Sequence, residues 1–73
     1  MGAGIVKRSV SIAGHRTSIS LEEPFWEEFR RLAARDGVSV NELAARLDEG
    51  RGEEAGLASA IRVFVLERAL ASR

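Results

Sequence analysis

Two short runs near the N-terminus alternate between apolar and polar residues. Between residues 15 and 21 the alternation has a period of two, which predicts a half-buried strand. Just upstream, Val10 and Ile12 alternate with serines in the same way, and the Ala13-Gly14 pair between the two runs fits a bend, a bulge or a hairpin turn. The inward face of the predicted strand would hold Thr17, Ile19 and Leu21, and its outward face Arg16, Ser18 and Ser20.

The residues after this strand have the spacing of an amphipathic helix that ends near Asp36. Ser20 and Glu23 are spaced as in a capping box, and Pro24 is tolerated only in a first turn, so we expect the helix to begin near Glu22 or Glu23. Its core stripe would consist of Phe25, Phe29, Leu32 and Ala33, with Trp26 at the edge.

Two further helices are predicted. Ser39 and Glu42 repeat the capping-box spacing at the start of the second helix, and a glycine-containing run from 49 to 56 ends it. The third helix covers residues 57 to about 70. Because its centre, residues 61 to 66, is apolar around most of its circumference, we expect burial on more than one side, in part by a second subunit. The buried stripe of the second helix would hold Val40, Leu43, Ala44 and Leu47.

The length of the chain points to a partner subunit. A chain of 73 residues forms one domain and buries only about 60% of its unfolded surface. It contains no cysteine and one histidine, so we predict no disulfide, no metal site and no cofactor. We therefore expect a homodimer in which the strand pairs with its own copy to form an antiparallel ribbon that helices cover on one face. The predicted dimer core is Ile19, Leu21, Phe29, Leu43, Ile61 and Phe64.

Charge is distributed unevenly along the chain. The net charge is zero, but residues 1–21 contain three basic residues and no acidic one. A dimer would bring two such segments together, and local charge governs phosphate binding more than the total does. A solvated basic tail is the alternative interpretation. No apolar run is long enough for a membrane span or a secretory signal, so we expect a cytoplasmic protein.

Several segments in this order resemble a known family. They are the strand 16–21, the helix 25–33 and the turn 37–43, together with the stretches 7–18 and 61–67. The chain resembles the ribbon-helix-helix superfamily of MetJ- and Arc-like regulators and, more closely, the small "ribbon-helix-helix domain" proteins of bacteria, particularly alphaproteobacteria. The resemblance covers residues 7–70.

The resemblance implies a mostly helical fold, with one strand that pairs with its dimer mate, two helices and an additional C-terminal helix. Residues 1–14 would be a basic arm or an extra strand, and residues 15–73 the dimerisation and DNA-binding domain. The chain departs from the superfamily because its second helix is short and a third follows. The stretch 56–62 also resembles a superfamily second-helix start, so two helix starts compete for the phosphate-binding role.

The function implied is that of a transcriptional regulator, expected to be a repressor, that binds double-stranded DNA as a homodimer or as tandem dimers. The ribbon would enter the major groove, where side chains can read bases. Carried over by position, the residues that contact bases are Arg16, Ser18 and Ser20. Those that contact the DNA backbone are Lys7 and Arg8 from a flexible arm, His15, and Ser39, Val40 and Asn41 at a helix start.

Two alternatives are kept beside this hypothesis. One is the antitoxin of a toxin–antitoxin pair. The other is a dimeric protein-interaction module that does not bind DNA and docks through its C-terminal helix. The zero net charge motivates the second, as do the glutamates at positions 22, 23, 27 and 28. No constellation of catalytic residues is present, so we do not expect an enzyme.

Overall fold

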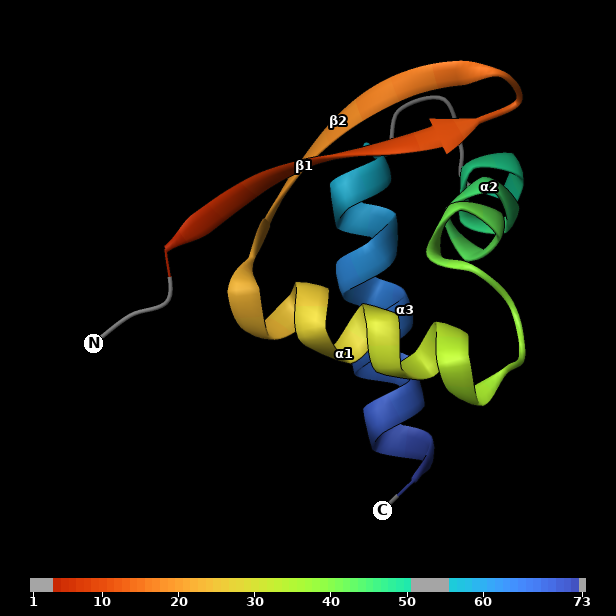
Figure 1. The fold of residues 1–73 in the computed structure, drawn as a ribbon. Coiled ribbons are helices and arrows are strands. Elements are labelled where there is room, and N and C mark those ends of the chain that lie inside the picture. Colours follow the sequence, from red (N-terminus) through yellow and green to blue (C-terminus); the bar gives the residue numbers. More distant parts are fainter. Residues whose placement is uncertain (1–3, 51–55, 73) are drawn as a thin grey trace.

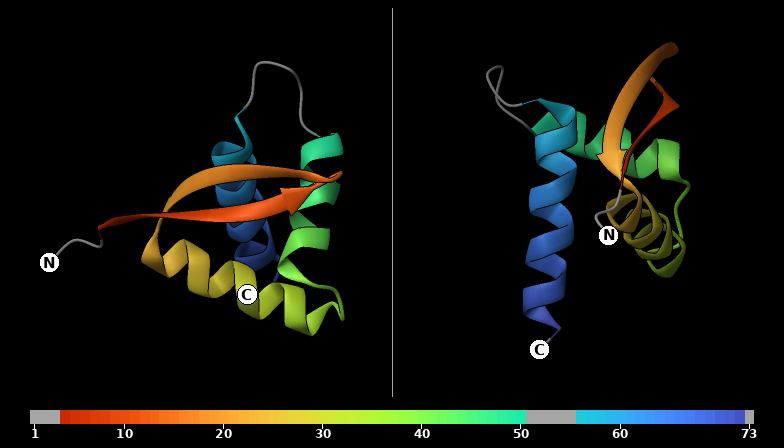
Figure 2. Two further views of the ribbon diagram at one scale, coloured as in Figure 1. Left: turned by 45° about the horizontal axis from the view of Figure 1, so that its top comes forward. Right: turned by 90° about the vertical axis from the view of Figure 1, so that its left-hand side faces the viewer.

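The computed structural model describes residues 4–50 and 56–72, which form a hairpin and three helices (Figure 1). Strands β1 (Ile5–Ile12) and β2 (His15–Glu22) pair with each other and lie on one side of the helices. The helices are α1 (Glu23–Arg35), α2 (Val40–Gly50) and α3 (Leu57–Ala71). In Figure 2, left, the hairpin crosses in front of α3, whose N-terminal end lies beside β2.

A tight turn joins the two strands within the same chain. Residues Ile12 and His15 face each other, and both residues between them have positive φ, 52° at Ala13 and 80° at Gly14. Two positive φ angles match a type I′ turn, whose twist suits the flanking strands. The run upstream of Ala13 is therefore an extra strand. The sequence led us to expect that a strand of a second copy pairs with β2. Along one edge of β2, strand β1 of the same chain takes that place.

The hydrophobic core closes within one chain. Leu21, Phe29 and Ile61 come from β2, α1 and α3, and each is 0% exposed. Phe64 is partly buried against this core, and its ring lies edge-on to that of Phe29, with the centroids 6.2 Å apart. The expectation that Ile19 and Leu21 need a second copy to be covered is therefore wrong, because α3 folds back over them on its own chain.

The start of α1 differs from the sequence prediction. Strand β2 extends to Glu22, which is the N-cap residue, and no side chain caps the helix. Ser20 lies in the strand and is exposed, so it cannot form the predicted capping box with Glu23. Trp26 was expected at the edge of the core stripe but is 1% exposed. Its indole Nε1–H donates to the backbone oxygen of Val6 at 2.9 Å, which ties α1 to β1.

The turn between α1 and α2 follows the predicted pattern. Gly37 has φ 75°, and the Val38 N–H donates to the Ala33 oxygen at 3.0 Å, as in a Schellman motif. The Ser39 hydroxyl accepts a hydrogen bond from the Glu42 N–H at 3.0 Å, which confirms Ser39 as the cap of α2. The helix continues through Gly50, beyond the expected break at residue 49; the rest of that predicted loop, residues 51–55, lies outside the described residues.

Among the described residues, two ion pairs fasten α3 to the rest of the domain. Arg62 donates to Glu22 at the end of β2 at 3.0 Å, and Arg68 makes a bidentate contact with Asp36 after α1, with both distances 2.9 Å. The hydrogen bonds from these arginines lower the pKa of the Glu22 and Asp36 carboxyl groups, with a smaller contribution from the positive charge. Both contacts are therefore strongest when the carboxylates are ionised.

We expect acid to loosen α3. Because the folded state lowers both carboxyl pKa values, the stabilisation is complete above the unfolded pKa and is lost as the pH falls through the folded pKa. The urea midpoint should fall between about pH 7 and about pH 3, and it should fall less steeply in an Arg68→Gln variant. Parallel pH profiles for the two chains would contradict this assignment.

Candidate nucleic-acid interface

The side of the hairpin that faces away from the helices carries six small or basic side chains, here called the ribbon face. They occur in three cross-strand pairs, Lys7–Ser20, Ser9–Ser18 and Ser11–Arg16, and all six residues are exposed. Alternation along each strand produces this arrangement, because the residues between them, such as Val10 and Ile19, point into the core. The next pair, Ile5 and Glu22, ends the ribbon, and the Glu22 carboxylate turns to Arg62.

The two cations of the ribbon face are available to a ligand. Within the part of the chain that the structure describes, neither Lys7 nor Arg16 takes part in an ion pair. They lie near opposite ends of the ribbon, Lys7 on β1 and Arg16 on β2. A guanidinium and an ammonium group separated by serine hydroxyls supply hydrogen-bond donors along the whole face, and the hydroxyls can also accept.

Arg8 does not belong to this face. Neighbouring strand residues point to opposite sides, so Lys7 and Arg8 diverge. Arg8 contacts Glu23 at 3.2 Å and lies over the Trp26 ring, 5.8 Å from its centroid. The two residues were expected on a flexible arm, but both lie in β1, and the Arg8 side chain is held by α1.

The start of α2 lies against the free edge of β1. Asn41 Oδ1 accepts a hydrogen bond from the Ser11 N–H at 3.0 Å. Asn41 and Ser39 were both predicted to contact phosphate. The side-chain oxygen of Asn41 is occupied by the Ser11 N–H, and that of Ser39 by the Glu42 N–H. The backbone N–H groups of the first turn of α2, beginning at Val40, are thereby held beside the turn end of the ribbon, where His15 is also exposed.

The glutamates that argued against nucleic acid are mostly neutralised. Glu22 pairs with Arg62, Glu23 contacts both Arg8 and Arg30, and Glu28 pairs with Arg31. In addition, residues 23–28 form the start of α1, which lies below the hairpin and not on its outer side (Figure 1). Their negative charge is therefore directed away from a ligand on the ribbon face.

Ser9 and Ser11 were missed as site residues by the sequence reasoning. The available signal was the pair of alternating runs separated by two residues that include a glycine, which is typical of a hairpin. Interpreted as a hairpin, that pattern places Ser9 and Ser11 on the same face as Ser18 and Arg16.

No described helix is long and apolar enough to cross a membrane, and no group of described residues has the composition of a metal site. A search of curated proteins found no match. A solved structure, that of an uncharacterized protein from Bordetella pertussis Tohama I, is 35% identical with a TM-score of 0.82. The alignment covers 97% of this chain and 60% of that one, so this chain spans about three fifths of its relative's length.

A family model described as "Ribbon-helix-helix domain" matches residues 5–69, which is nearly the whole chain. The match confirms the fold expected from the sequence, a mostly helical domain with an N-terminal β-ribbon. Such domains are typical of regulatory proteins that are not enzymes, and they typically bind DNA as dimers. This chain belongs to the ribbon-helix-helix domain family.

Proposed function

We propose that this chain is a sequence-specific DNA-binding regulator whose hairpin enters the major groove of double-stranded DNA. The observation that carries the proposal is the ribbon face, which exposes two cations and four hydroxyls and contains no carboxylate. Paired strands lie about 4.8 Å apart, so a two-stranded ribbon fits a groove about 12 Å wide.

The outward residues differ in the chemistry they offer to DNA. Arg16 can form a bidentate contact with the O6 and N7 atoms of guanine, which is worth about 1–3 kcal/mol of discrimination. Serine hydroxyls at positions 18 and 20, and at 9 and 11, can donate to or accept from several bases, so they contribute less selectivity. Lys7 supplies a point charge for phosphate and adds affinity that does not depend on sequence.

A second phosphate contact is proposed at the start of α2. The unpaired backbone N–H groups of a first helical turn attract anions. The Asn41–Ser11 hydrogen bond holds this turn of α2 next to the ribbon, so a DNA strand that flanks the groove would lie within its reach. This supports the earlier of the two competing helix starts. A DNA-binding role agrees with the predicted cytoplasmic location, and repression stays a prediction that a promoter–reporter measurement would test.

The test starts by enriching duplexes from a random library with the wild-type chain and then measures binding by fluorescence anisotropy. Arg16→Ala should weaken binding to the enriched duplex by about 5- to 150-fold, which corresponds to the loss of one bidentate base contact. Binding to an unrelated duplex should change much less. Arg35→Ala is the matched control, because Arg35 is exposed at the end of α1, outside the ribbon face, and its loss changes the net charge equally.

Failure of the library to enrich any duplex would remove the proposal. Equal effects of Arg16→Ala and Arg35→Ala would also contradict it, because the ribbon would then contribute only general charge.

A further inference from the structure

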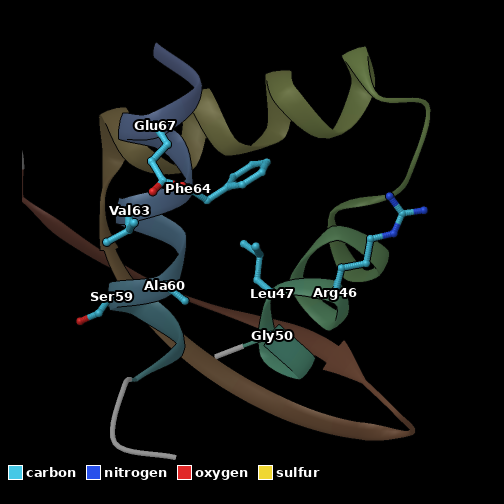
Figure 3. A pocket seen from close by; sticks show the side chains of 8 residues that line it. All are labelled: Arg46, Leu47, Gly50, Ser59, Ala60, Val63, Phe64 and Glu67. Atoms are coloured by element: carbon cyan, nitrogen blue, oxygen red, sulfur yellow. The ribbon is translucent and has the colours of Figure 1, made fainter. Parts of the chain in front are cut away.

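A hollow of about 360 Å³ lies between helices α2 and α3. Its wall is largely apolar, and Figure 3 shows Leu47 of α2 and Phe64 of α3 pointing into it toward each other. Benzene fills an apolar cavity of about 150 Å³, so this hollow has room for a molecule the size of about two fused rings. An apolar wall with a few polar groups is the usual composition of a small-molecule site.

Small residues leave this hollow unfilled. Ala60 lines it from α3, and Gly50 lines it from the end of α2. A Cβ atom added at Gly50 would meet nothing within 4 Å. The side chains that border the hollow therefore lack contacts on one side, and a bound molecule would restore these contacts.

One charged side chain at the hollow has no partner. Ala60, Phe64 and Glu67 are spaced by four and three residues, so Glu67 lies on the same face of α3 as the Phe64 ring. Among the described residues, Glu67 makes no hydrogen bond or ion pair. Arg46, which also lines the hollow, contacts Glu42 at 3.3 Å, and in Figure 3 it extends away from α3. The unbalanced charge at the hollow is therefore negative.

Another hollow provides a contrast. It measures about 270 Å³ and lies between α1 and α3, where Phe25, Leu66 and Ala69 border it. The charged residue at its rim, Arg62, contacts Glu22 at 3.0 Å. Because its charge is balanced, this hollow does not favour a ligand of either sign.

We propose that the hollow between α2 and α3 binds an organic cation, an aromatic body of one or two rings that carries an ammonium group. The rings lie against Leu47 and Phe64, and the ammonium group pairs with Glu67. The Arg68 guanidinium, 5.4 Å from the Phe64 ring centroid, opposes a cation little because Asp36 pairs with it. Since Glu67 is exposed, the apolar contacts supply most of the affinity and the ion pair supplies the preference for positive charge.

Three naphthalene derivatives test the proposal with the full chain. The methylamine, the methanol and the carboxylate, all substituted at the same ring position, have the same shape and are positive, neutral and negative at neutral pH. Their binding is followed by the NMR shifts of backbone amides. The ammonium compound should bind most tightly, with shifts at residues 46–50 and 59–67. The alcohol should bind about 1.5- to 5-fold more weakly, which is the contribution of an exposed ion pair, and the carboxylate more weakly still.

Variants locate the two parts of the site. Glu67→Gln should remove the difference between the ammonium compound and the alcohol and leave binding of the alcohol unchanged. Ala60→Leu should fill the hollow and weaken all three compounds. Gly50→Leu should do the same from α2, which keeps the test decisive if one of the two variants loses structure. Ala71→Leu is the matched control, because it makes the same change as Ala60→Leu at an exposed position of α3.

The proposal would be overturned if none of the three compounds bound, or if the carboxylate bound more tightly than the ammonium compound. Equal affinities in Ala60→Leu, Gly50→Leu and Ala71→Leu would also overturn it. Shifts confined to Phe25, Leu66 and Ala69 would do so as well, because they would place the compound in the other hollow. None of these measurements involves DNA, so their outcome is independent of the proposed function.

Discussion

Replacing Phe29 by alanine is expected to leave the chain largely unfolded at room temperature. Phe29 is 0% exposed and packs edge-on against Trp26 and Phe64, with ring centroids 6.5 and 6.2 Å away. Removing a buried phenylalanine costs about 3–5 kcal/mol. A core of this size rarely supplies more than about 3–5 kcal/mol of net stability, so the substitution removes most of it.

The measurement is urea unfolding followed by far-UV circular dichroism. Phe25→Ala is the matched control, because it makes the same chemical change on the same helix at a half-buried position and should cost less. The loss in Phe29→Ala should not depend on chain concentration, since Phe29 is buried inside one chain. Equal midpoints for the two variants would contradict the central position given to Phe29.

The second large expected effect is on the salt dependence of DNA binding. Under the proposed function, each copy of the homodimer expected from the sequence would bring one Lys7 to phosphate, and each phosphate contact lowers log K by about 0.9 per unit of log salt. A dimer of Lys7→Gln should therefore show a slope less steep by about two units. Between about 50 and about 200 mM salt, this variant should lose roughly tenfold less affinity than the wild type.

Binding of enriched and unrelated duplexes across a salt series provides the check. Lys7→Gln should weaken both kinds of duplex alike, unlike Arg16→Ala, which should act mainly on the enriched one. Arg35→Gln changes the charge by the same amount outside the ribbon face and should leave the slope near that of the wild type. An unchanged slope in Lys7→Gln would show that Lys7 does not contact phosphate.

The inward and outward faces of β2 could be predicted from the sequence, because a period of two has only one interpretation when one side is buried. Ile19 and Leu21 are buried, while Arg16, Ser18 and Ser20 are exposed, as expected. The same rule, applied to β1, would have separated Lys7 from Arg8. From the sequence, however, Ala13-Gly14 fits a bulge as well as a turn, and a bulge would shift the alternation of β1 by one residue.

The structure also differs from the sequence prediction in where β2 ends and in which chain covers the core. Ser20 and Glu23 have the spacing of a capping box, but spacing does not reveal that the strand continues to Glu22. The apolar circumference of α3 predicts burial on more than one side. In the single chain the side with Ile61 and Val65 is buried, whereas Val63, Leu66 and Leu70 are about half exposed, so cover by a second subunit stays a prediction. The sequence could not show how this burial is divided, because the same pattern fits a core closed by a second chain or by α3 folding back.

The hairpin also affects the symmetry of any DNA sequence that it reads. A ribbon built from two copies of one strand is identical to itself after a half-turn, so it matches a palindrome at its centre. Strands β1 and β2 differ in sequence, with Lys7 opposite Ser20 and Arg16 opposite Ser11, so this ribbon has a direction. Under the proposed function, each hairpin would therefore read a stretch of bases with no internal symmetry, and in a homodimer only the relation between two such stretches would need to be symmetric.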